Sequence, residues 1–170
     1  MRKSVLAVVA TTPLVVALGC MGSNSLSGSM SEVFPLDVSN VEILRNDDAF
    51  QVSYYNYNGV GIDLVARVSV SLDGWDFVAG KNYPLQGEDD AGQQRTSVLH
   101  LASESPPEPL ANVYLGVLEL DKGANIGQTT QGSFSMSFVS DGGFGGGFTL
   151  QGSFSGKAQD AGYGDGNWPD

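Results

Sequence analysis

Most of the chain alternates between apolar and polar residues, which is the pattern of β-strands that bury one face. The alternation is most regular over 131–157, where two arms flank a glycine-rich turn. One parity of the first arm holds Phe134 and Phe138, and one parity of the second holds Leu150 and Phe154. The opposite parity is almost entirely serine, threonine and glutamine. We therefore predict a β-hairpin that turns its phenylalanines into the core and its serines outward.

A short phrase recurs in this hairpin. Gly-Ser-Phe-Ser occurs at 132–135 and at 152–155, and the related Gly-Ser-Met-Ser occurs at 28–31. The repetition predicts that the first strand lies beside the hairpin, with Met30 near the two phenylalanines. The two ends of the domain would then be close together.

Period-two patterns and turn residues predict further strands along the chain. They cover 25–34, 38–44, 49–57, 62–72, 75–85 (short and irregular), 96–102 and 112–121.

The segment 62–72 is the most regular of these, because every even position is apolar and Val65 is the only apolar residue at an odd one. Both parities of 112–121 are partly apolar, which predicts a strand in the middle of the sheet that is covered on both faces. No segment has a convincing helical period. We therefore predict an all-β fold, an antiparallel β-sandwich of about nine strands, with a small β-barrel as the alternative.

Length and composition fit one domain. The chain has 170 residues, of which 41% are hydrophobic and 16% charged. We place the β-sandwich domain at 26–158 and predict a disordered tail at 159–170, which is rich in glycine and acid and has little to bury. The chain has 19 Asp and Glu against 8 Lys and Arg, a net charge of −11. This excess weighs against nucleic acid as a partner.

The N-terminus has the three parts of a secretory signal peptide, predicted at 1–19. Arg2 and Lys3 are followed by an apolar run over 5–18 and by the small Gly19. The run is too short to span a membrane, which favours a cleaved signal over an anchor helix.

Residues 16–20, Val-Ala-Leu-Gly-Cys, resemble the lipobox of bacterial lipoproteins. The resemblance covers the first twenty residues. It implies cleavage before Cys20, a diacylglycerol on the Cys20 sulfur and an acylated new amine, so that 20–25 would be a lipidated tether. A conventional signal peptide with a free cysteine is the alternative.

The same resemblance implies a location in the cell. Lipoproteins of this type tend to stay at the inner membrane when Asp follows the cysteine, and here the residue is Met21. We therefore expect a lipid-anchored protein of the bacterial cell envelope, in the outer membrane. The body of the chain resembles small β-rich lipoproteins.

Candidate catalytic chemistry is sparse. His100 is the only histidine and Cys20 the only cysteine, so neither a zinc site nor a thiol–histidine pair is expected. We interpret His100 as a half-exposed strand residue. The acidic segments 88–90 and 160–167 are candidates for calcium, but neither follows a complete ligand loop, and solvated acid is the preferred interpretation. We predict no metal and no cofactor.

Four aromatic residues form a candidate binding surface: Tyr55, Tyr57, Trp75 and Phe77. The two tyrosines fall on the outward parity of their strand, and the other two share a parity. Such aromatics can stack on sugars or dock a protein, whereas cross-strand aromatic pairs also stabilise sheets without any ligand.

We therefore expect a non-enzymatic envelope protein with a binding or structural role, attached to the membrane through its lipid and able to meet a protein or carbohydrate partner. The alternative is a carbohydrate-active or other hydrolytic enzyme with paired carboxylates, which would need two acids about 5 to 9.5 Å apart in a cleft.

Overall fold

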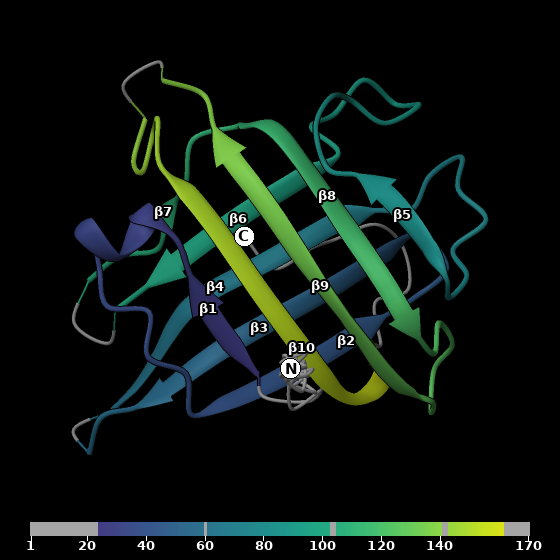
Figure 1. Ribbon diagram of the computed structural model, residues 1–170, viewed down its shortest axis with the longest axis horizontal. Coiled ribbons are helices and arrows are strands. Elements are labelled where there is room, and N and C mark those ends of the chain that lie inside the picture. Colours follow the sequence, from purple (N-terminus) through teal and green to yellow (C-terminus); the bar gives the residue numbers. More distant parts are fainter. Residues whose placement is uncertain (1–23, 60, 103–104, 141–142, 162–170) are drawn as a thin grey trace, which may run out of the picture.

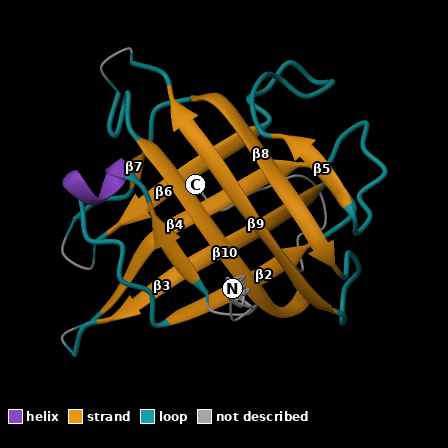
Figure 2. Ribbon diagram, in the orientation of Figure 1, coloured by secondary structure: helices purple, strands orange, loops and turns teal. Residues whose placement is uncertain are grey.

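The structure, a computed structural model, describes residues 24–59, 61–102, 105–140 and 143–161. These residues are all-β, as predicted, with one short 3-10 helix, η1 (Ser29–Glu32) (Figure 2). The strands are β1 (Ser25–Ser27), β2 (Asn40–Arg45), β3 (Ala49–Tyr57), β4 (Ile62–Ser71), β5 (Lys81–Pro84), β6 (Thr96–Leu101), β7 (Glu108–Pro109), β8 (Val113–Lys122), β9 (Thr129–Phe138) and β10 (Thr149–Asp160).

The strands form one curled sheet. Its hydrogen-bonded order is β5-β8-β9-β10-β2-β3-β4-β6-β7, and β1 pairs with β10 outside this path. In Figure 1 strands β8, β9 and β10 cross in front of β2, β3, β4 and β6, so that the sheet folds back on itself as a half-barrel. The core lies between these two layers.

Aromatic side chains hold the two layers together. Phe50 of β3 packs on Phe154 of β10 at 5.7 Å between ring centres. Tyr54 of β3 meets Phe134 of β9 edge-on at 6.0 Å and donates a hydrogen bond from its hydroxyl to the Ser153 carbonyl at 3.2 Å. Burial raises the pKa of Tyr54 far above its ordinary value, so this tyrosine stays a neutral hydrogen-bond donor.

The predicted hairpin and its parity are confirmed. Strands β9 and β10 pair antiparallel, with Phe134 opposite Gly152 and Phe154 opposite Gly132. All four residues are buried, whereas Ser135 is exposed. The two copies of the phrase therefore pair with each other, which places each phenylalanine beside the glycine of the other copy.

The first strand does lie beside the hairpin, because β1 pairs with β10 and Leu26 faces Gly152. The strand is shorter than predicted, however, since the backbone turns at Gly28 (φ 120°) into η1. Met30 is fully buried, but on η1 and close to Gly145 in the β9–β10 connection. The prediction of a continuous strand over 25–34 that carries Met30 was wrong.

The prediction that all neighbouring strands run antiparallel was wrong for one pair of strands. Strand β10 runs parallel to β2, with residues 158–160 alongside residues 43–45. The sheet is therefore mixed, and the domain continues past the predicted boundary at 158. Gln159 and Asp160 gave no apolar signal because backbone hydrogen bonds, and not buried side chains, hold them in the strand. Most of the predicted tail, from residue 162 onward, lies outside the described residues.

A β-bulge explains the irregular Val65. Tyr54 pairs with Ala66 and Tyr55 pairs with Leu64, so Val65 is the extra residue on β4. A bulge leaves one extra residue unpaired and interrupts the regular ladder. Leu64, Val65 and Ala66 are accordingly all buried, whereas Ile62, at the start of the strand, is 57% exposed although it belongs to the apolar even positions.

Three smaller predictions also differ from the structure. Only Lys81–Pro84 of the predicted strand 75–85 is a strand, and the proline-rich connection before β8 contains the short β7. Strand β8 lies within the sheet, between β5 and β9. Its first residues are not covered on both faces, however, because Tyr114 and Leu115 are exposed.

Candidate functional site

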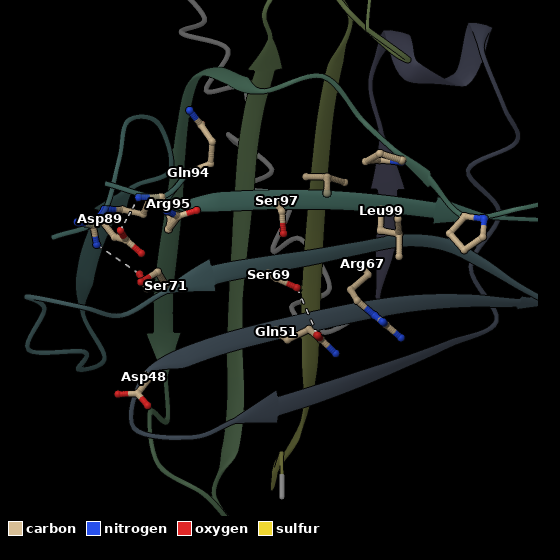
Figure 3. A pocket seen from close by; sticks show the side chains of 14 residues that line it. Asp48, Gln51, Arg67, Ser69, Ser71, Asp89, Gln94, Arg95, Ser97 and Leu99 are labelled. Atoms are coloured by element: carbon tan, nitrogen blue, oxygen red, sulfur yellow. Dashed lines mark hydrogen bonds between the residues drawn. The ribbon is translucent and has the colours of Figure 1, made fainter. Parts of the chain in front are cut away.

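A cleft of about 690 Å³ lies on the outer face of β3, β4 and β6 (Figure 3). Clefts of roughly 300 to 1,000 Å³ are typical of small-molecule sites. The loop before β6 contributes to it at one end, and the proline-rich segment around β7 contributes at the other. The lining residues are Asp48, Gln51, Arg67, Ser69, Ser71, Asp89, Gln93, Gln94, Arg95, Ser97, Val98, Leu99, Pro107 and Pro109.

Strand register builds the floor of the cleft in two rows. Side chains that alternate with the core positions lie on the outer face of each strand. The first row crosses the sheet through Gln51, Ser69 and Ser97. The second row crosses it through Ser53, Arg67 and Leu99 and ends at Pro109 of β7. One row is therefore polar, and the other passes from polar to apolar.

A chain of hydrogen bonds joins the polar side chains of the two rows. The Ser69 hydroxyl donates to Gln51 Oε1 at 3.3 Å, and Gln51 Nε2 donates to Ser53 Oγ at 3.3 Å. Arg67 Nε donates to the same Ser53 oxygen at 3.4 Å. Gln51 is only 2% exposed and Ser53 is fully buried, so these bonds satisfy polar groups that have lost water.

Arg95 holds the other end of the cleft together. Its guanidinium donates to the carbonyls of Asp73 at 2.9 Å and Glu88 at 3.2 Å, and it lies over the Trp75 ring at 4.5 Å. Arg95 is buried. These contacts fix the loop against the end of β4, so Arg95 is a structural residue of the wall.

The side chain of Asp89 also stabilises the loop before β6. Its carboxylate accepts the backbone N–H groups of Gln93 at 2.9 Å and Ala91 at 3.0 Å. The Gln93 hydrogen bond is the main reason that the pKa of Asp89 lies below its ordinary value; Ser71, Ala91 and the nearby Arg95 lower it further, against partial desolvation.

The low pKa of Asp89 bears on the hydrolase alternative. Asp48 and Asp89 are the two carboxylates among the described residues that line the cleft. A glycosidase needs one carboxyl with a raised pKa to protonate the leaving group. The pKa of Asp89 is shifted in the opposite direction, so Asp89 is unsuited to that role.

The four predicted aromatic residues are not brought together. The Tyr55 hydroxyl donates to Glu42 at 3.0 Å, and Tyr57, at the end of β3, is 52% exposed. Trp75 lies beyond the opposite end of the β3–β4 pair, where Leu72 bonds to Asp48 at the start of β3.

Phe77 was wrongly predicted as a surface residue. It is 5% exposed and packs in the core against Phe50 at 5.1 Å and Tyr83 at 4.9 Å. The backbone over 75–80 is not a strand, so alternation cannot assign its faces.

His100 behaves as a structural strand residue, as interpreted from the sequence. It is half-buried on β6 and stacks on Phe34 at 4.0 Å between ring centres. Its Nδ1 lies 2.9 Å from the Val65 carbonyl oxygen, and this contact joins His100 to the bulge of β4. Cys20, the predicted site of lipid attachment, lies outside the described residues.

Among the described residues, no group of three or more His, Cys, Asp or Glu side chains is placed so that it could hold a metal ion. Within the same ranges there is no helix long and apolar enough to cross a membrane. No protein-family model, curated protein or solved structure matches this chain.

Sequence reasoning missed the cleft. Its floor is made of side chains from three strands, which no single segment of the sequence reveals. The one feature of the sequence that could have pointed to it is Arg67, a charged residue among the serines at the odd positions of 67–71.

Proposed function

We propose that the protein is a lipid-anchored, non-catalytic binding protein of the bacterial cell envelope, and that the cleft over β3, β4 and β6 holds its ligand. The observation that carries this proposal is the combination of volume and lining. The cleft has room for a small molecule, its floor is a hydrogen-bonded set of polar groups, and one side is apolar. A small number of precisely placed polar groups beside an apolar surface is characteristic of small-molecule binding sites.

The lining favours a small molecule over a carbohydrate chain. Among the described residues that line the cleft, none is aromatic. Sugar sites commonly use an aromatic face, and the predicted aromatic residues that could supply one are dispersed. Serine, glutamine and arginine side chains instead suit a compact ligand with polar atoms at defined positions.

The lipobox resemblance supports the anchor. Cleavage before Cys20 would place the lipidated cysteine five residues before Ser25, the first residue of β1. A fully extended chain of that length spans at most about 18 Å. The domain would therefore stay close to the membrane surface, and Met21 after the cysteine favours the outer membrane.

For the architecture, we propose an open barrel, and a sandwich, with this mixed sheet, becomes the alternative. Support comes from β10, whose residues 149–157 pair with β9 and whose residues 158–160 pair with β2. Hydrogen bonding thus passes from one layer to the other along a single strand.

The test of the binding proposal fills the cleft with a bulky side chain. Ser97 is exposed on β6 and lines the cleft, whereas Ser135 is exposed on β9 outside it. Small molecules that co-purify with the protein from bacterial extract would be identified by mass spectrometry for wild type, Ser97→Trp and Ser135→Trp.

We expect a compound that wild type and Ser135→Trp retain and that Ser97→Trp loses. If Ser97→Trp is folded and retains the same compounds as the other two proteins, the cleft is not the binding site.

A further inference from the structure

We infer that the ligand of this cleft carries an oxyanion, such as a carboxylate, phosphate or sulfonate, which binds to Arg67, and an apolar part that rests on Leu99 and Pro109. This inference rests on the function proposed above and names the chemical class of the ligand.

The hydrogen-bond chain does not use the terminal N–H groups of Arg67. Ser53 Oγ accepts from both Gln51 Nε2 and Arg67 Nε. Toward the described residues Arg67 therefore donates only from its Nε, which leaves the four N–H groups of its two terminal nitrogens for a ligand. A guanidinium presented in this way matches the two oxygens of a carboxylate or the oxygens of a phosphate.

The other described arginines are used differently. Arg95 donates to backbone carbonyls at the edge of the cleft, and Arg45 donates to the Asn125 side chain at 3.3 Å and lies over Phe77. Within the described ranges the one salt bridge joins Lys81 and Asp76, so no carboxylate there comes within 4.0 Å of Arg67. A half-buried cation without an anionic partner is costly, and an anionic ligand would relieve that cost.

The acidic groups of the cleft lie away from Arg67. Arg67 precedes Ser71 by four residues on β4, roughly 13 Å along the strand, and Asp48 and Asp89 are near the Ser71 end. Figure 3 shows Asp48 and Asp89 at one end of the cleft and Arg67 toward the other. Glu42 faces Ser53 from β2, where it accepts the Tyr55 hydroxyl. An anion would thus be favoured at one end only, which fixes the direction of the ligand.

The apolar part of the site begins on β6, the strand next to Arg67 on the side opposite Ser53. Leu99 is the register partner of Arg67 on β6, and Pro109 is the partner of Leu99 on β7. Pro107 completes this side of the lining. A ligand whose anion contacts Arg67 therefore places its adjoining atoms against hydrocarbon.

Two fluorescent probes that differ by a single group test the inference. Anilinonaphthalene sulfonate has a sulfonate on its rings, and phenylnaphthylamine is the same molecule without it. We expect the wild-type protein to bind the sulfonate probe about tenfold or more tightly than the neutral one, as a charge-assisted hydrogen bond predicts. Arg67→Gln should abolish this preference. The control Lys157→Gln removes the same charge from an exposed position on β10 and should keep it.

Equal affinity for the two probes in wild type, or an unchanged preference in Arg67→Gln, would overturn the oxyanion assignment. So would a wild type that binds neither probe. Should Arg67→Gln fail to fold, Arg67→Lys keeps the charge without the planar fork, and the preference should fall by a smaller factor. Ser97→Trp separates the two proposals: if it blocks the neutral probe the cleft remains the binding site, and if it affects neither probe both proposals fail.

Discussion

Phe134 lies against Gly152 on the neighbouring strand so closely that a β-carbon on the glycine would stand 2.5 Å from the phenylalanine ring. The pair is repeated in reverse, because Phe154 lies against Gly132, where a β-carbon would be 2.7 Å from its ring. The repeated Gly-Ser-Phe-Ser phrase therefore makes a reciprocal contact, in which each large side chain occupies the space that a glycine leaves open.

Removal of either ring should be severely destabilising. We expect Phe134→Ala and Phe154→Ala each to lower the free energy of unfolding by about 3 to 5 kcal/mol, because each change removes apolar contact and leaves a cavity. Ser135 follows Phe134 on β9 but is exposed, so Ser135→Ala should change the free energy of unfolding by less than about 0.5 kcal/mol. Urea unfolding of the three variants measures this. Wild-type midpoints for both phenylalanine variants would show that the core does not depend on these contacts.

Addition of one carbon to the glycine tests the same contact from the other side. Gly152→Ala should cost about 1 to 3 kcal/mol through overpacking. The matched control is Gly156→Ala on the same strand, where the new β-carbon would meet Ile43 at an ordinary 3.4 Å. We expect Phe134→Leu to rescue part of the loss in Gly152→Ala, since the smaller side chain makes room. Additive losses in the double variant would contradict a direct clash.

The Asp89 loop should make a pH-dependent contribution to stability. The folded-state pKa of Asp89 is lowered, so its stabilising effect is present above the unfolded-state pKa of about 3.9 and is lost as the pH falls through the lower folded value. Asp89→Asn should therefore unfold at lower urea than wild type at pH 7.

The difference between Asp89→Asn and wild type should shrink as the pH is lowered below about 4. The control Asp47→Asn changes an exposed aspartate in the β2–β3 turn and, as a surface substitution, should alter the stability little at pH 7. A constant difference across the whole pH range would mean that Asp89 acts through shape and not through its charge.

The lipid anchor makes a separate prediction. Cys20→Ser removes the one thiol that could carry a diacylglycerol, so the variant should appear as an uncleaved or soluble protein in fractionated cells. Continued recovery of the variant with membranes after a carbonate wash would disprove the lipoprotein proposal.

Local patterns predicted the parts of the fold that depend on a single strand. The parity of Phe134 and Phe154 could be assigned because period two is unbroken along both arms. The bulge at Val65 could not, because an extra residue is defined only by the register of the partner strand. The end of β10 was missed because Gln159 and Asp160 carry no apolar side chain for the alternation to reveal.

The cleft was beyond local patterns for a related reason. Gln51, Arg67 and Ser97 are distant in sequence and meet because β3, β4 and β6 are neighbours in register. An arginine on a polar strand face is compatible with many surroundings. Only the structure shows that Arg67 adjoins Leu99 and that no carboxylate of the described residues lies within 4.0 Å of its guanidinium. The aromatic residues drew attention because exposed rings often bind ligands, but Phe77 lies in an irregular segment where parity is uninformative.

The position of β10 in the sheet has a consequence for biogenesis. It is the last described strand in sequence, yet it lies between β9 and β2 and also pairs with β1, so no strand pairing among the described residues joins the two halves of the sheet until it is in place. Contacts of such long sequence separation form slowly. β10 follows the other described strands in sequence, so during synthesis they lack the partner that joins the two halves of the sheet. The sheet can therefore close only after β10 has been synthesised.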